Sequence, residues 1–360
     1  QHLVVPLLEG SGGTSINMNI NEVLCNRALQ IMGYSVGEYH ILHPNDHVNK
    51  GCSTNDIVPS AINIAAYLGM EECLNNVLIL VNSLKKKQAE FSEVLRLGRT
   101  CLQDAQPMTL GQAFGGYASV IERSYKYLEN CRLQLLTIPL GGTAIGTGLG
   151  SSPGFKVAIY KELNKHFTLA IKACSNPFDG MQNLDDTQRL SAELEVLSGA
   201  MSKIAKDFII LSSGPSGGLA EIKLPSVQPG SSIMPGKVNP VIPMSVVQVY
   251  QLVHGNHASI SLAVSDGLLE INHYEMLVAS RLFESMQLIT EVSLSFAQLC
   301  IDNIEADSKR CLENLMNSFA LATTLVPKLG YDLVCSLVKE SNAKNCSFIE
   351  IAIESGYIDS

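Results

Sequence analysis

Apolar residues recur at helical spacing along much of the chain. The clearest pattern lies between residues 190 and 211. Its apolar positions alternate between steps of four and three residues: Leu190, Leu194, Leu197, Met201, Ile204, Phe208 and Leu211. Such an unbroken heptad seam predicts a long helix that packs lengthwise in a bundle.

The same spacing appears in other segments. The stretch from residue 60 to 97 contains one Gly and no Pro, and apolar residues recur in it at Leu74, Val77, Val81 and Leu84. A further stripe runs through Leu282, Met286, Ile289, Phe296 and Cys300, with Ser293 as a polar interruption. Residues 112–136 and 243–265 also look helical, and no convincing run of period two indicates a strand. The chain is therefore predicted to be all-α, a long-helix bundle whose apolar stripes form its core.

Three segments rich in Gly, Ser and Thr separate these helices, namely residues 98–112, 140–154 and 212–240. They are predicted to be loops, and loops of this length are uncommon in compact domains unless they are functional. Residues 1–55 are also rich in Gly, Asn, Ser and Thr. We expect a loop-rich part over 1–55, a central long-helix bundle over 56–303 and a small C-terminal helical domain over 304–360.

Composition narrows the class of protein. With 25 Lys plus Arg against 34 Asp plus Glu, the formal net charge is −9, which argues against a nucleic-acid partner. A negative net charge is unfavourable for the long-range attraction of an anionic substrate. A carboxylate site nevertheless needs only a few local donors, since bulk charge governs solubility and long-range steering. Only 16% of residues are charged, which favours a large core or extensive subunit contacts.

Two further observations bear on the protein's environment. No stretch approaches the ~20 consecutive apolar residues of a membrane helix, so no membrane partner is expected. The ten cysteines are scattered and form no C-x-x-C pair, which is typical of free thiols in a reducing cytoplasm and gives no zinc spacing.

The segment GSSIMPGKVNP, residues 230–240, carries the most chemical information. Ser231 and Ser232 offer hydroxyls, Lys237 a positive charge, and Asn239 an amide at a predicted helix start. Together with loop amides, this set suits a carboxylate. A serine there could also act as a base if its alkoxide were stabilised by Lys237 and loop amides. A purely structural Gly/Pro turn is the alternative, and spacing alone leaves both interpretations open.

The same segment resembles the signature of the fumarase/aspartase superfamily, G-S-S-x-M-P-x-K-x-N. Further blocks resemble the family in the same order, at residues 12–23, 43–56, 98–112, 140–149 and 211–225. The resemblance extends from about Gly10 to Tyr357. Within the superfamily, the runs DHVNK (46–50) and STND (53–56) look most like aspartases, the aspartate ammonia-lyases.

The resemblance implies a cytoplasmic homotetrameric enzyme of amino-acid metabolism with a central twenty-helix bundle. Each active site would be built from three subunits. The implied reaction is elimination of ammonia from L-aspartate to give fumarate, without a cofactor and without a metal. Relatives carry a small N-terminal domain ahead of the point where this chain starts, so that domain is expected to be missing here.

The resemblance also implies roles for individual residues. Ser231 would be the base, on a mobile loop that closes over the substrate. Donors for the β-carboxylate would be Ser232, Thr14, Ser53 and Thr54. Lys237, Asn239 and Thr100 would hold the α-carboxylate, and Asn55 would face the amino group. Several of these residues have simpler interpretations, because Ser53, Thr54 or Asn55 could cap a helix and Thr14 could be a turn residue.

Three positions depart from the family pattern. Cys101 replaces a His or Gln, Met244 replaces the Glu that supports that His, and Ala113 replaces a Glu. Hydroxide is a poor leaving group that needs a general acid, whereas an ammonium group already carries its proton. The departures therefore favour an ammonia-lyase, with Cys101 among the residues near the substrate. A fumarate hydratase, a lyase for another succinyl-type substrate and a non-catalytic relative are the alternatives.

Overall fold

Long helices dominate the computed structural model, which describes residues 2–8, 10–344 and 346–358. The chain divides into two compact units. Unit 1 comprises Gln1–Asn76, Ser124–Gly199 and Val249–Glu291, and unit 2 comprises Val77–Arg123, Ala200–Gln248 and Val292–Ser360. The boundaries fall inside α2 (Thr54–Glu90), α3 (Leu110–Gln134), α6 (Asp185–Leu211), α7 (Val241–Ser265) and α8 (Glu275–Leu299). These helices confirm the all-α prediction, whereas the division at 1–55, 56–303 and 304–360 stays a prediction.

The heptad seam lies in α6, as its spacing predicts. In unit 1, Leu190, Leu194 and Leu197 are fully buried. In unit 2, the seam continues with Met201, Ile204, Phe208 and Leu211, which are buried as well. An apolar side chain at each step of four and three residues therefore removes one stripe of the helix from water.

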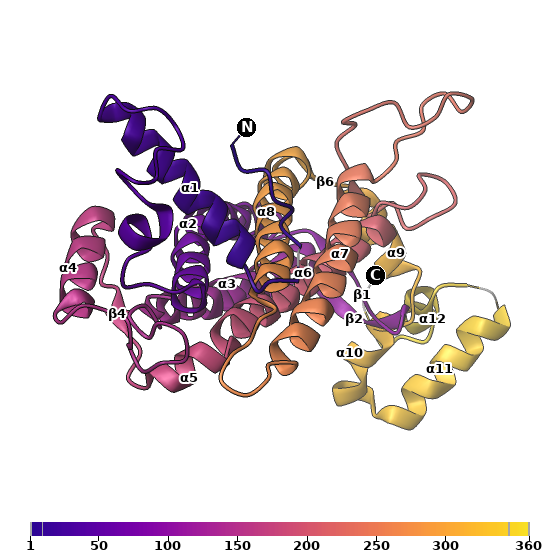
Figure 1. The fold of residues 1–360 in the computed structure, drawn as a ribbon. Coiled ribbons are helices and arrows are strands. Elements are labelled where there is room, and N and C mark those ends of the chain that lie inside the picture. Colours follow the sequence, from indigo (N-terminus) through magenta and orange to yellow (C-terminus); the bar gives the residue numbers. More distant parts are fainter. Residues whose placement is uncertain (1, 9, 345, 359–360) are drawn as a thin grey trace. The chain divides into compact units, whose positions relative to one another are not determined.

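Unit 1 also contains the N-terminal helix α1 (Thr14–Ile31), which packs against the short helix η1 (Pro44–Val48) (Figure 1). Two further helices, α4 (Phe155–Phe167) and α5 (Pro177–Gln182), lie in the same unit. Strands β3 (Thr137–Ile138) and β4 (Lys172–Ala173) form a short parallel pair. Unit 1 contains two buried apolar clusters. The first consists of Val58, Ile62, Met276 and Ala279, and the second of Ile64, Ile138, Leu140 and Ile171.

Unit 2 is centred on aromatic packing. The ring of Phe114 lies edge-on to Phe91, with centroids 5.3 Å apart, and stacks on Phe208 at 5.4 Å. Phe208 in turn contacts Phe296 at 5.6 Å. Because three of these rings come from different helices and Phe91 directly follows α2, the cluster ties α3, α6 and α8 to the end of α2.

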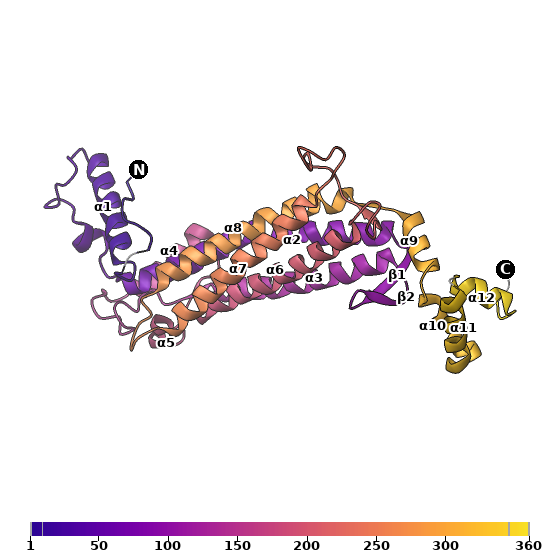
Figure 2. The same cartoon turned by 90° about the vertical axis from the view of Figure 1, so that its right-hand side faces the viewer.

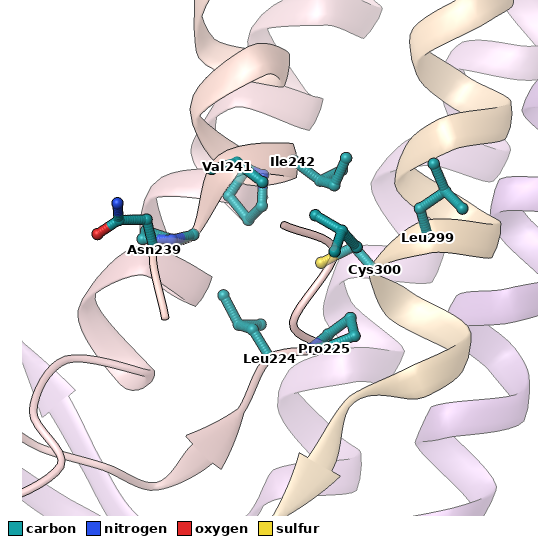
Figure 3. Close-up of a pocket in the computed structure, with 10 residues that line it drawn as sticks. Leu224, Pro225, Asn239, Val241, Ile242, Leu299 and Cys300 are labelled. Atoms are coloured by element: carbon teal, nitrogen blue, oxygen red, sulfur yellow. The ribbon is translucent and has the colours of Figure 1, made fainter. Parts of the chain in front are cut away.

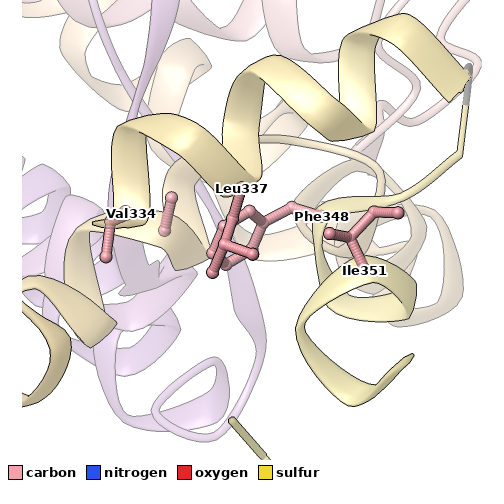
Figure 4. Packing of buried hydrophobic residues seen from close by; sticks show 5 residues of the cluster. Val334, Leu337, Phe348 and Ile351 are labelled. Carbon is pink, nitrogen blue, oxygen red and sulfur yellow. The ribbon is translucent and has the colours of Figure 1, made fainter. Parts of the chain in front are cut away.

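Strands β1 (Leu95–Thr100) and β2 (Gln103–Thr109) form an antiparallel hairpin in unit 2, and α9 (Ser308–Met316) packs on β1 (Figure 2). A second antiparallel pair joins β5 (Ile222–Lys223) to β6 (Glu305–Ala306), close to the short helix η2 (Ile301–Asn303). The chain ends in α10 (Ala320–Leu329), α11 (Tyr331–Lys344) and α12 (Phe348–Glu354). These helices share a small apolar cluster of Ala322, Val334, Leu337, Phe348 and Ile351 (Figure 4).

The hairpin corrects the expectation of a plain loop over residues 98–112. Its strands lack period-two hydrophobicity because β1 places two arginines, the buried Arg96 and the half-buried Arg99, beside the carboxylate of Glu221. A buried polar pair of this kind cannot be read from local spacing, since its partner lies far along the chain.

Helix α2 is relevant to the prediction, made from the sequence, that the chain does not cross a membrane. One window of α2 is long and apolar enough to cross a membrane by length and composition, and 44% of that window is buried inside the protein. Core helices of water-soluble proteins pass the same test, so this finding is weak support for a membrane span.

Candidate active site

The signature segment, residues 230–240, forms an exposed loop in unit 2. The Oγ of Ser231 accepts hydrogen bonds from the backbone N–H groups of Ile233 and Met234, each at 3.2 Å. Ser232 and Lys237 are exposed on the same loop. The loop amides therefore converge on the hydroxyl of Ser231, in an arrangement that would favour negative charge on this oxygen.

The two ends of this loop are held together. The amide Nδ2 of Asn239 donates to the carbonyl of Gly230 at 2.5 Å. A Cβ on Gly230 would lie 1.9 Å from the carbonyl oxygen of Lys237, so only glycine allows the strands of the loop to cross here. Asn239 therefore fixes the neck of the loop in this structure, where the sequence predicts a carboxylate ligand.

A small pocket lies at the base of the loop (Figure 3). It has a volume of about 10 Å³ and is lined mainly by apolar side chains, among them Leu224, Pro225, Ile242 and Leu299. That volume accommodates about one water molecule. The pocket is therefore too small to hold a dicarboxylate.

Thr100 and Cys101 lie at the tip of the β1–β2 hairpin, also in unit 2. Thr100 pairs with Gln103 across a two-residue turn in which Cys101 has φ 52° and Leu102 φ 60°. Turns with two positive φ values normally contain Asn or Gly. Non-glycine residues in such conformations concentrate at functional sites, and all three residues of this tip, Thr100 to Leu102, are exposed.

Ser53, Thr54 and Asn55 lie in unit 1, at the start of α2. The buried carboxylate of Asp56 organises this turn: it accepts from the N–H groups of Ser53, Gly141 and Thr143, each at 2.9 Å. Burial raises the pKa of Asp56, and these hydrogen bonds oppose the shift. The Nδ2 of Asn55 donates to the carbonyl of Ala144 at 2.8 Å, so the 140–154 loop and the start of α2 are held together.

Buried asparagines hold α1 against the same turn. The Nδ2 of Asn17 donates to the hydroxyl of Thr54 at 3.0 Å, and Asn21 donates to Asn49 at 3.1 Å. Neither these asparagines nor Asp56 was predicted from the sequence. The two asparagines could have been found from their spacing. Asn17 and Asn21 are four residues apart and so share one face of a helix, where an apolar core would not need amides.

Thr14 begins α1 in unit 1, directly after Gly13, whose φ is 85°. Its hydroxyl donates to the carbonyl of Ser11 at 3.0 Å, and its side chain is exposed. A Cβ on Gly13 would approach Val58 within 3.2 Å, so this glycine lets α1 start close to α2. The candidate residues thus form two groups, one in each unit: Thr14, Ser53, Thr54 and Asn55 in unit 1, and Thr100, Cys101, Ser231, Ser232, Lys237 and Asn239 in unit 2.

A larger cavity of about 160 Å³ lies in unit 1 and contains none of these candidates. Within the described part of the chain, its lining includes Asp179, Asp185 and Asp186 but no Lys or Arg. Carboxylates repel one another at close range, so this cavity does not suit a dicarboxylate. Among the residues that the structure describes, no group of three or more His, Cys, Asp or Glu is placed to hold a metal ion.

Fold and chemistry together define a class: a long-helix protein whose loops present hydroxyls, amides and a lysine of the kind that bind small carboxylates. A family model described as lyase matches residues 1–255. The aspartate ammonia-lyase of Helicobacter pylori is 40% identical over 351 residues, which cover 98% of this chain and 75% of the relative. The mitochondrial fumarate hydratase of Saccharomyces cerevisiae is 38% identical, over 99% of this chain and 73% of the relative.

Solved structures that resemble this chain belong to proteins of the same kind as these relatives. The fumarate lyase:delta crystallin from Brucella melitensis bound to cobalt matches with a TM-score of 0.95 and 40% identity, over 98% of this chain and 77% of that chain. The class II fumarase from Schistosoma mansoni matches with a TM-score of 0.93 and 35% identity, over 98% of this chain and 77% of that chain. The chain belongs to the fumarase/aspartase superfamily of lyases.

Proposed function

We propose that the protein eliminates ammonia from L-aspartate to give fumarate, with Ser231 as the base. The observation that carries this proposal is the pair of backbone N–H donors on the Oγ of Ser231. A serine becomes basic enough to abstract a carbon-bound proton only if its alkoxide is stabilised. Two amide dipoles aimed at this oxygen supply part of that stabilisation.

In the proposed mechanism, Ser231 removes a proton from the carbon next to the β-carboxylate. Negative charge then develops on that carboxylate, giving an aci-carboxylate intermediate, and the amine leaves in an anti-elimination. Hydroxyls that donate to the β-carboxylate would stabilise this charge, as in an oxyanion hole. They are those of Thr14, Ser53, Thr54 and Ser232.

The α-carboxylate and the amino group need their own partners. Lys237 supplies the positive charge for the α-carboxylate, with Asn239 and Thr100 as hydrogen-bond donors. The Nδ2 of Asn55 donates to the carbonyl of Ala144, so its side-chain oxygen would be the atom that faces the amino group. Asn239 must exchange its bond to Gly230 for one to the substrate, which fits a loop that rearranges as it closes.

The choice of ammonia as leaving group rests on Cys101 and Met244. Cys101 lies exposed at the hairpin tip, and Met244 is exposed in the first turn of α7. A thiol and a thioether cannot replace the imidazole–carboxylate pair of related enzymes as a general acid. Ammonia does not need such an acid, because the ammonium group already carries its proton.

We further propose a cytoplasmic homotetramer whose active sites combine residues of three subunits. Exposed apolar side chains on the long helices support this proposal, among them Leu68, Tyr127, Val196, Leu252 and Leu262. A water-soluble monomer would rarely leave so many apolar residues of long helices uncovered.

The test is a parallel assay of the purified protein with L-aspartate and with L-malate, following fumarate by its ultraviolet absorbance. We expect fumarate from aspartate, and a loss of about 10²–10⁴-fold in kcat for Ser231→Ala because its base is missing. Ser226→Ala, an exposed serine on the same segment, is the matched control and should keep full activity. Equal activity of Ser231→Ala and wild type would overturn the assignment of the base.

Fumarate hydratase is the second candidate, and the similarity to the Saccharomyces cerevisiae enzyme, at 38% identity, favours it. In that case malate would yield fumarate and aspartate would not. Should neither substrate react, the alternatives are a lyase for another succinyl-type substrate and a non-catalytic relative.

A further inference from the structure

A single buried carboxylate lies between two arginines in unit 2. The side chain of Glu221 is fully buried, at 0% exposure. Its Oε2 accepts from Nε of Arg96 at 2.8 Å, and its Oε1 lies 2.8 Å from Nη1 of Arg99. The Nδ2 of Asn314 donates to the same Oε1 at 3.1 Å. Both carboxylate oxygens therefore have charged partners, as a buried carboxylate requires.

The backbone of Glu221 is fixed on both sides. Its N–H donates to the carbonyl of Leu211, the last residue of α6, at 2.9 Å. Its carbonyl accepts from the N–H of Asp307 at 3.0 Å. The next residues form β5, which pairs with β6. The carboxylate is thus a rigid anchor, because the backbone that carries it cannot move without breaking these bonds.

Both arginines belong to β1, and Arg99 directly precedes Thr100. The register of the β1–β2 hairpin shifts between Leu97 and Arg99. At this point a Cβ on Gly98 would lie 2.7 Å from the carbonyl oxygen of Gln106. A shifted ladder bends and twists a hairpin. Strand pairing alone therefore leaves the direction of the tip open, and the two guanidinium contacts constrain it together with the packing of α9 on β1.

We propose that Glu221 is a positioning residue that aims the hairpin tip, with Thr100, at the substrate. Glu221 also begins the segment that leads to the signature loop at residue 230. Glu221 would therefore help to position two groups assigned to the α-carboxylate of the substrate, namely Thr100 and the signature loop. The inference rests on the proposed function for its effect on catalysis, but not for its effect on the hairpin.

The first test measures the hairpin itself by amide hydrogen exchange of peptides covering residues 95–106 in the full-length protein. Glu221→Gln keeps the shape of the side chain but removes its charge, and we expect exchange in these peptides to speed up at least about tenfold. The matched control is Lys87→Met, which removes another buried charge of unit 2, one bonded to the carbonyl of Ile304 at 2.7 Å and to Glu90. Equal exchange in both variants would overturn the proposal.

The second test asks whether Glu221 acts through Thr100. Glu221→Gln should lower kcat/KM for aspartate at least about tenfold in the wild type, yet less than about threefold in a Thr100→Ala background, since groups that act as a unit are not additive. Lys87→Met should have the same effect in both backgrounds. Independent, multiplying effects of Glu221→Gln and Thr100→Ala would contradict a positioning role.

The two tests separate this inference from the proposed function. If the wild type eliminates nothing from aspartate, the proposed function fails, and hydrogen exchange still decides the role of Glu221 in the hairpin. If Glu221→Gln does not fold, Asn314→Ala leaves both arginine contacts in place and removes the amide that donates to Oε1 at 3.1 Å and to the carbonyl of Leu219 at 3.3 Å. It is expected to speed up exchange over residues 95–106 in the same direction. Unchanged exchange in Asn314→Ala would then count against the proposal.

Discussion

At the scale of single residues, buried carboxylates differ according to the donors around them. Asp56 accepts three backbone N–H groups and Glu221 faces two guanidinium groups. Glu275, at the start of α8, is 1% exposed, and neither of its carboxylate oxygens has a hydrogen-bond partner among the described residues. Desolvation raises the pKa of Glu275 to about 9. The first two carboxylates hold backbone segments in place, whereas burial favours the neutral acid form of the third.

Glu275 makes the stability of the protein depend on pH. Its pKa is raised from 4.5 in the unfolded chain to about 9 in the fold, so the folded state retains a proton that the unfolded state releases between these values. Stability from this group is complete below pH 4.5 and is lost as the pH rises towards 9, by roughly 1 kcal/mol per pH unit. Glu275→Gln should remove this slope, because glutamine does not ionise.

The measurement is urea unfolding of wild type and Glu275→Gln at several values between pH 5 and pH 9. The variant should become progressively more stable than the wild type as the pH rises. Glu270→Gln, an exposed glutamate that precedes the same helix, is the control and should follow the wild type at every pH. Parallel curves for wild type and Glu275→Gln would show that the carboxyl ionises in the fold.

At the scale of elements, the β1–β2 hairpin combines a strained tip with a firmly held base. Cys101 and Leu102 take positive φ values that glycine or asparagine adopts more easily. The base is fixed through Arg96 and Arg99. Non-glycine residues in a strained backbone conformation at an exposed tip are typical of segments whose side chains contact a ligand.

Leu102→Gly should therefore stabilise the fold, since glycine removes a conformational cost of about 1–2 kcal/mol at a left-handed position. Leu102 is exposed, so little packing is lost. Leu102→Ala is the control because alanine keeps the strain while it shortens the side chain. Thermal unfolding should rank Leu102→Gly above Leu102→Ala, and the reverse order would show that the tip is unstrained.

At the scale of the whole molecule, the candidate residues are divided between two units of one chain. Asn55 belongs to unit 1 and Ser231 to unit 2. In the proposed tetramer, a single active site would take these two residues from different subunits. Symmetric assembly would then complete each site with residues of neighbouring copies.

Subunit mixing tests this arrangement. Asn55→Ala and Ser231→Ala should each be nearly inactive, but co-refolded tetramers should regain activity, with roughly one quarter of the sites intact after random mixing of a symmetric assembly. Ser231→Ala refolded alone is the control and should stay inactive. Sites built within a single chain would give no recovery in the mixture.

Much of the fold could be predicted from the sequence. The heptad seam from Leu190 to Leu211 coincides with α6, because helical periodicity is a local property of the chain. The β1–β2 hairpin could not be predicted in this way. Its buried Arg96 meets Glu221 across 125 residues of sequence, and a polar residue next to a distant partner has no periodic signal.

The candidate site shows the same limit. The hydroxyls, the lysine and the amides could be named from the signature and its companion blocks, and membership of the superfamily is confirmed by the relatives. The contacts that hold these groups in place could not be predicted from the sequence. The carboxylate of Asp56 reaches the Gly141 and Thr143 amides across more than 80 residues of sequence, and the bonds from Asn17 to Thr54 and from Asn239 to Gly230 likewise depend on how the loops fold back.

The sequence by itself determined the long helices, the class of chemistry and the absence of the usual acid at Cys101, because residue type and spacing act locally. Only the tertiary structure decided which side chains serve as anchors, that Ser231 already accepts two amides, and that Glu221 holds β1. Burial of a charge is favourable only when its partner is present, and which residues meet depends on the folded path of the whole chain.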